Sequence, residues 1–260
     1  MNGRTPVPPT TRSARRGPLH RGRSSTLRAV LFDMDGTLVE TEELWGEAMT
    51  ALAGQLGGVF SDAGRQQTVG TSMRVAMGVL YADLGVERTE EQLRTDARWV
   101  EEETAALMTS RGMPWRPGAR ELLTAVCEAG LATALVTTTP RRIATIVLDR
   151  IAAELGSSPF DVTVCGDEVT ARKPDPAPYR QAMAALGVDP GSSLVIEDSL
   201  VGVTAGLASG AAVLGVPSLQ PLELQPGLAL RFTLTGVGVA DLVALRRDLP
   251  VPVDAGQPAC

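Results

Sequence analysis

Histidine, lysine and the aromatic residues are scarce in this chain of 260 residues. The single histidine, His20, lies in an arginine-rich N-terminal stretch, which excludes a mechanism based on a Ser–His or Cys–His pair in the folded body. Cys127, Cys165 and Cys260 form no CxxC pattern, so a zinc site is not expected. We interpret them as two buried thiols and a tail residue in a reducing compartment, and we predict a cytoplasmic protein.

Long apolar runs are also absent, since no segment approaches the roughly 20 apolar residues of a membrane-spanning helix. The formal net charge is -6, but residues 1–28 carry seven arginines and no acidic residue. Subtracting these seven positive charges leaves -13 on residues 29–260. This negative charge on residues 29–260 argues against nucleic acid as the main partner. We expect no membrane partner either, and a monomer or a weak dimer.

The two ends of the chain lack the patterns of folded segments. Residues 1–27 are rich in Pro, Arg, Ser and Thr, and we predict a disordered basic extension there. An organelle transit peptide or a misassigned start codon would look the same. We predict a flexible tail over residues 251–260.

Short, continuously apolar runs separated by helical segments indicate a buried parallel sheet. The predicted strands are 29–32, 134–136, 162–165 and 194–196, and helices are predicted at 118–129 and 176–186. Three of the four strands place an acid or a hydroxyl at their carboxyl end, where such sheets bind ligands. The predicted fold class is α/β, a Rossmann-like parallel sheet sandwiched by helices.

The gap between the first two predicted strands, about 95 residues, is far longer than a crossover requires. Between Leu93 and Met108, apolar residues recur every three or four positions, as in an amphipathic helix. We therefore predict an inserted all-α domain at 45–113. Residues 28–44 and 114–250 would form the α/β core domain.

Two carboxylates, Asp33 and Asp35, follow the first predicted strand and are separated by Met34. One could attack phosphorus to form an aspartyl phosphate, while the other transfers a proton. Such crowding predicts a nearby cation or a raised pKa. Alone, however, the pair could equally belong to a turn or a helix cap.

Lys173 is the only lysine, although the chain has 23 arginines. A sequence so rich in arginine would readily supply one at an indifferent position. A compact ammonium can bridge a nucleophile and a phosphoryl oxygen, where a guanidinium fork is too large. The plainer alternative is a surface lysine beside a proline turn.

Four segments together resemble the motifs of the haloacid dehalogenase-like hydrolases. They are Asp33-Met34-Asp35-Gly36-Thr37, Thr137, Lys173-Pro174-Asp175-Pro176, and Glu197-Asp198-Ser199 with Gly202. The resemblance covers about residues 29–215 and is to the phosphatase and β-phosphoglucomutase-like subgroup. In that subgroup a helical cap is inserted after the first motif, which here corresponds to 45–113. Taken singly, the threonine and Glu197-Asp198-Ser199 segments could be helix caps.

The resemblance implies a role for each matching residue. Asp33 would be the nucleophile and Asp35 the general acid and base, with Thr137 and Lys173 completing the catalytic set. Phosphate binding would involve Met34, Gly36, Thr137, Thr138 and Lys173. Mg²⁺ would be bound by Asp33, the backbone carbonyl of Asp35 and Asp198, with Glu197 close by through water.

Several reactions occur in this family, and single residues discriminate among them. Dehalogenases lack the second acid, here Asp35, and phosphonate cleavage uses a cap lysine that this chain lacks. Mutases bring a cap histidine, arginine and lysine; here Trp45 stands in place of the histidine and Met73, beside Arg74, near the arginine. The three tryptophans, which include Trp99 and Trp115, are interpreted as core or hinge packing.

We therefore predict removal of phosphate from a small phosphorylated metabolite, a sugar phosphate or similar. A β-phosphoglucomutase-like mutase is the alternative, and a non-catalytic phosphate-binding or regulatory module is the alternative of another class. For substrate specificity the cap offers only loose candidates such as Arg74.

Overall fold

The structure is a computed structural model that describes residues 26–249. The predicted N-terminal extension lies outside these residues apart from Thr26 and Leu27, and the predicted tail 251–260 lies outside them entirely. Across the described range no helix is both long enough and apolar enough to cross a membrane.

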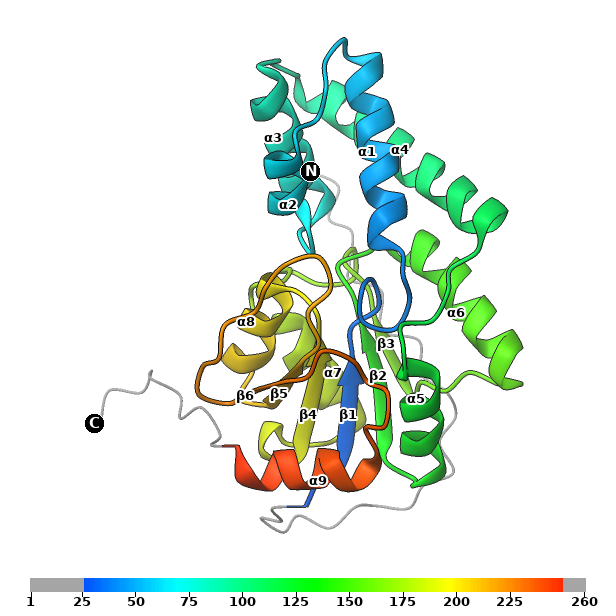
Figure 1. Ribbon diagram of the computed structural model, residues 1–260, viewed down its shortest axis with the longest axis vertical. Helices are drawn as coiled ribbons and strands as arrows, with labels where there is room; N and C mark the ends of the chain where they lie inside the picture. The colour runs from blue at the N-terminus through cyan, green and yellow to red at the C-terminus, as the bar shows by residue number, and fades with distance from the viewer. Residues whose placement is uncertain (1–25, 250–260) are drawn as a thin grey trace.

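A parallel sheet forms the centre of the molecule (Figure 1). Its strand order is β3-β2-β1-β4-β5-β6. The strands are β1 (Ala29–Phe32), β2 (Ala132–Val136), β3 (Val162–Val164), β4 (Ser193–Glu197), β5 (Ala212–Gly215) and β6 (Leu228–Leu230). Phe32 pairs with Leu135 of β2 and Ile196 of β4, so the carboxyl ends of these three strands lie level. The four predicted strands are present, and β5 and β6 were not predicted.

Helices cover both faces of the sheet because the strand side chains alternate between them. Val30 and Phe32 pack with α5 (Ala119–Glu128), α6 (Arg141–Leu155) and α9 (Val239–Asp248). Ala29 and Leu31 pack against α7 (Ala177–Leu186) and α8 (Leu200–Ala208) on the other face. A 3-10 turn, η1 (Pro190–Ser192), precedes β4. This three-layer arrangement is the predicted α/β fold.

The inserted all-α cap is present above the carboxyl edge of the sheet (Figure 1). It consists of α1 (Glu42–Gln55), α2 (Asp62–Thr68), α3 (Met73–Leu84) and α4 (Glu90–Arg111). The cap has an apolar core of its own, which includes Leu52, Phe60, Met77, Leu80 and Val100. Because α1 begins at Glu42, its first turn precedes residue 45, where the insertion was predicted to start. The exact domain boundaries stay a prediction.

Two chain crossings connect the cap to the core, and they are hydrogen-bonded to each other. The Glu40 N–H donates to the Pro114 carbonyl at 2.9 Å, and the Arg116 N–H donates to the Leu38 carbonyl at 2.8 Å. The Arg116 guanidinium also pairs with the Glu40 carboxylate. On another side, Arg142 of α6 forms a 2.5 Å ion pair with Glu101 of α4. The cap therefore contacts the core beyond the two crossings as well.

Candidate active site

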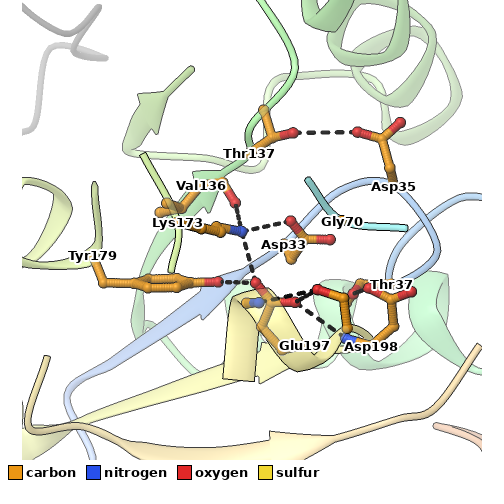
Figure 2. Close-up of polar contacts among 12 residues, drawn as sticks. Asp33, Asp35, Thr37, Gly70, Val136, Thr137, Lys173, Tyr179, Glu197 and Asp198 are labelled. Carbon is orange, nitrogen blue, oxygen red and sulfur yellow. Dashed lines mark hydrogen bonds and ion pairs between the residues drawn. The ribbon is translucent and has the colours of Figure 1, made fainter. Parts of the chain in front are cut away.

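Lys173 lies at the centre of a buried polar cluster at the carboxyl edge of the sheet (Figure 2). Its ammonium donates to Asp33 Oδ1 at 2.7 Å, to Glu197 Oε1 at 2.7 Å and to the Val136 carbonyl at 2.8 Å. All three of its donor positions are thus used. Burial opposes the charge, but the Asp33 and Glu197 carboxylates outweigh it and raise the pKa of Lys173. The lysine is a fixed positive charge beside the Asp33 carboxylate.

Glu197, which ends β4, is fully buried and accepts four hydrogen bonds. Its Oε1 accepts from Lys173 and from the Tyr179 hydroxyl at 2.6 Å. Its Oε2 accepts from the Asp198 N–H at 3.2 Å and from the Ser199 hydroxyl at 3.3 Å. Burial and Glu197 raise the pKa of Tyr179, so the phenol is a neutral donor, and its ring centroid lies 4.9 Å from Lys173 Nζ. Glu197 therefore holds Lys173 in place as well as contributing to the acidic cluster.

Asp33, Glu197 and Asp198 offer carboxylate oxygens that lie within 4.8 Å of one another. Burial and then Glu197 raise the pKa of Asp33 to about 7, with Lys173 opposing them. Asp198 Oδ1 accepts a hydrogen bond from Thr37 at 3.2 Å, whereas its buried Oδ2 has no partner. Burial, Asp33 and Glu197 raise the pKa of Asp198. A buried oxygen without a donor is costly, and a hard divalent cation fits this donor set.

Asp35 is buried and accepts from four side chains. Thr41, at 2.5 Å, and the Trp45 indole, at 3.3 Å, donate to Oδ1. Thr137, at 3.2 Å, and Thr139, at 2.7 Å, donate to Oδ2. Figure 2 shows this carboxylate directed toward Thr137 and apart from the Asp33 carboxylate. Of the four donors only Thr137 was predicted as a site residue; Trp45 was interpreted as packing.

The remaining predicted residues lie around this cluster in different ways. The Met34 side chain is fully buried in the core, and its carbonyl accepts from Leu38 at 2.9 Å and Val39 at 3.2 Å. Gly36 has a φ of 77° and turns the chain beside Asp198. Thr138 is half-buried and lines the neighbouring cavity. Their phosphate-binding roles stay predictions.

A cavity of about 300 Å³ lies between this edge and the cap. Asp35, Thr138 and Thr139 contribute to its wall from the core. Asp33 and Lys173 are not among the wall residues. The cap residues of the wall are Glu42, Trp45, Gly46, Met49, Asp62, Arg65, Gln66, Thr68, Val69, Gly70, Thr71, Met73 and Ala76. The cavity therefore adjoins the cluster at Asp35 and extends from there to the cap.

Glu42, at the start of α1, is a wall residue that the sequence did not single out. Burial, followed by the charges of Asp35 and Asp33, raises its pKa to about 8. The Gly70 N–H donates to its Oε1 at 3.4 Å. An acidic pair at a helix start, here Glu42 and Glu43, is common for reasons of helix stability alone, which concealed this residue.

Comparisons with known proteins agree with this geometry. Residues 30–216 match the family model described as haloacid dehalogenase-like hydrolase. The phosphorylated carbohydrates phosphatase of Thermotoga maritima is 34% identical over 184 residues, which are 71% of this chain and 82% of that protein. The crystal structure of CbbY from Rhodobacter sphaeroides in complex with phosphate is similar with a TM-score of 0.73 and 27% identity, covering 84% of this chain and 99% of that one.

A mutase shares the fold as well. The structure of β-phosphoglucomutase from Clostridium difficile has a TM-score of 0.73 at 19% identity, covering 85% of this chain and 97% of that one. At this identity the likeness bears on the fold and not on the reaction.

Proposed function

The chain belongs to the haloacid dehalogenase-like hydrolase family, and from that premise we propose that it is a Mg²⁺-dependent phosphatase of a small phosphorylated metabolite. One observation carries the proposal: the single lysine is bonded to Asp33 beside a buried Asp198 oxygen that has no partner. A sugar phosphate or a similar compound is the proposed substrate, in line with the name of the Thermotoga relative. The predictions of a cytoplasmic monomer or weak dimer without nucleic-acid or membrane partners stay predictions.

The metal site is proposed on the three clustered carboxylates. Asp33 and Asp198 would be direct ligands together with the backbone carbonyl of Asp35. Because the Glu197 oxygens already accept four hydrogen bonds, Glu197 would contribute through a water molecule. When bound, Mg²⁺ would offset the negative charge of the phosphoryl group and of the acids around it.

In the proposed first step, an oxygen of Asp33 attacks phosphorus and the bond from phosphorus to the ester oxygen breaks. Asp35 gives a proton to that leaving oxygen, which departs as the alcohol. Lys173 remains charged throughout, and it favours the ionised form of Asp33 and stabilises the charge on the phosphoryl oxygens. The phosphoryl group is then covalently attached to Asp33.

In the second step, water attacks the phosphorus atom of the aspartyl phosphate. Asp35, now ionised, takes a proton from this water, and the Asp33 carboxylate leaves as inorganic phosphate forms. The hydrogen bonds from Thr41, Trp45, Thr137 and Thr139 would hold the Asp35 carboxylate in a fixed orientation for this proton transfer.

Trp45 favours hydrolysis over the mutase alternative. The residue occupies the position at which the mutases of this family are expected to have a histidine. Its indole can only donate a hydrogen bond and cannot exchange a proton with a sugar hydroxyl. The chain also has no cap lysine, because Lys173 of the core is its only one.

The test is turnover of phosphate monoesters by the full chain with and without Mg²⁺. We expect p-nitrophenyl phosphate to be hydrolysed only with the metal, and inorganic phosphate, not an isomerised sugar phosphate, to be the product. The Asp33→Asn variant should lose at least about 10³-fold in kcat while remaining folded, because the nucleophile is removed. Equal activity of this variant would exclude the covalent route. An isomerised product would favour the mutase.

A further inference from the structure

Arg65 is the only basic residue in the wall of the cavity, counting the residues of 26–249 that line it. It lies on α2 and is half-buried. Its guanidinium has no hydrogen-bonding or ionic partner within the described part of the chain. Four other cap arginines are paired with acids: Arg74 with Glu90, Arg88 with Asp96, Arg98 with Glu102 and Arg111 with Glu47. A fifth, Arg94, donates to the Glu90 carbonyl at 3.2 Å. A partly buried guanidinium that faces a cavity without a counter-charge is available to a ligand.

Gly46 makes room for this guanidinium. It lies in the interior of α1, where glycine costs stability relative to alanine. A Cβ at position 46 would stand 2.0 Å from one terminal nitrogen of Arg65 and 2.8 Å from its Cζ. The missing side chain is therefore what allows Arg65 to lie against α1, at the wall of the cavity.

The rest of the cavity wall makes Arg65 the favourable place for a negative group. Asp35, at the core side of the wall, is acidic and would repel one. Trp45, Met49 and Met73 give part of the wall an apolar surface, and apolar surroundings strengthen charge interactions. Asp62, one turn before Arg65, is exposed and forms no ion pair with it.

We propose that Arg65 selects substrates that carry a second anionic group, a carboxylate or a phosphate, remote from the phosphoryl group that is transferred. The inference rests on the proposed phosphatase function, because it names the substrate class of the same site. The reacting phosphoryl group lies against Asp33 and Lys173, and the second anion extends through the cavity to Arg65. A guanidinium binds both carboxylate and phosphate in a bidentate manner, so Arg65 would recognise either group through the same contacts.

Three matched probes test the proposal with the full chain and Mg²⁺: hexose 6-phosphate, the corresponding hexonic acid 6-phosphate, and hexose 1,6-bisphosphate. We expect kcat/KM to be about 10-fold or more higher for at least one of the two probes with a second anion. The probe with the higher kcat/KM shows whether the second anionic group is a carboxylate or a phosphate. Arg65→Gln should raise the KM of the favoured probe about 10-fold to 100-fold and leave kcat and the KM of hexose 6-phosphate nearly unchanged.

Two further variants separate recognition from folding. Arg74→Gln, which removes a paired cap arginine outside the cavity wall, should leave all three KM values unchanged. Gly46→Ala should reproduce the KM effect of Arg65→Gln without loss of thermal stability, because it displaces the guanidinium while favouring the helix. In the double variant the two effects should not add, since both act on one contact.

Failure of the inference and failure of the proposed function give different results. Equal kcat/KM for the three probes, unaltered by Arg65→Gln, overturns the inference and leaves the phosphatase standing. If no phosphate ester is turned over, the proposed function fails. Calorimetric titration of the Asp33→Asn protein with hexose 1,6-bisphosphate and hexonic acid 6-phosphate then decides the inference. Binding that is about 10-fold weaker after Arg65→Gln supports it, and binding unchanged by that substitution overturns it.

Discussion

Gly36 lies against Asp198 so closely that a Cβ at position 36 would stand 2.2 Å from the Asp198 Oδ2 oxygen. That oxygen is the buried acceptor without a partner, which we assign to the metal. The backbone at Gly36 also has a φ of 77°, which residues with a side chain adopt at a cost. One glycine thus provides both the turn after Asp33, the proposed nucleophile, and the space for Asp198, the proposed metal ligand.

Gly36→Ala should weaken metal binding as well as folding. We expect the Mg²⁺ concentration for half-maximal turnover to rise about 10-fold to 100-fold, because Asp198 is displaced. The free energy of unfolding should fall by about 1–2 kcal/mol from the backbone strain. Gly57→Ala is the matched control, since Gly57 has a φ of 83° but a Cβ there would meet no atom within 4 Å. The control should lose similar stability and keep its Mg²⁺ dependence; a parallel change in both variants would contradict the assignment.

Gly202→Ala should destabilise the protein although the residue lies in helix α8. A Cβ there would stand 1.9 Å from Glu197 Cδ, so the carboxylate that holds Lys173 has to move. We expect a loss of about 1–3 kcal/mol in chemical denaturation, together with lower kcat. Gly78→Ala in α3 offers the comparison, because nothing lies within 4 Å of its Cβ position. That change should stabilise the protein by about 0.5–1 kcal/mol, the ordinary result for a helical glycine. If both variants were more stable than the unchanged protein, the Glu197 carboxylate would have room to move, which would contradict this prediction.

Replacing Lys173 should affect stability and activity together. Lys173→Met leaves Asp33 and Glu197 buried without their cation, and the expected loss is about 3–5 kcal/mol in the free energy of unfolding. Lys173→Arg keeps the charge, but a guanidinium does not fit where the side chain is 2% exposed. We expect kcat to fall at least about 10²-fold for this variant. Tyr179→Phe removes one hydrogen bond to Glu197 and is the milder comparison, with most activity retained. Near-normal turnover of Lys173→Arg would contradict the proposed role of the ammonium.

Glu42 predicts how the stability of the metal-free protein depends on pH. Its pKa is raised from 4.5 to about 8, so the folded state binds the proton more tightly than the unfolded state. Stability should therefore fall as the pH rises through the window from about 4.5 to 8. Thermal unfolding in the presence of a chelator should show this decline, and Glu42→Gln should make it shallower. A Tm of the variant that declines as steeply as that of the unchanged protein would refute the contribution of Glu42.

The short apolar strands and the residues that follow them could be predicted from the sequence. Asp33 comes directly after β1 and Glu197 ends β4, so parallel pairing in register brings them to one edge. The uniqueness of Lys173 pointed to a special environment, and the buried contacts with Asp33 and Glu197 are such an environment. Strand β6 has only three residues, and a run of this length is hard to tell from a loop by its pattern; β3 is equally short, but its predicted run continued to Cys165.

Contacts between helices and strands could not be predicted from the sequence in this way. Tyr179 was not singled out from the sequence, because only the packing of α7 against the sheet brings its hydroxyl to Glu197. Arg74 was a loose candidate for substrate specificity, yet it pairs with Glu90 and is not a wall residue of the cavity. Which cap arginine faces the cavity depends on how α2 and α3 pack against α1, and helical periodicity alone does not determine that packing.

The four donors to Asp35 come from two parts of the molecule that are joined by the paired crossings. Thr41 and Trp45 precede or belong to α1 of the cap, whereas Thr137 and Thr139 follow β2 of the core. A rotation of the cap about the crossings would remove two donors and leave the other two. The Asp35 carboxylate would therefore keep all four of its hydrogen bonds only while the cap lies against the core, so its orientation is coupled to the position of the cap.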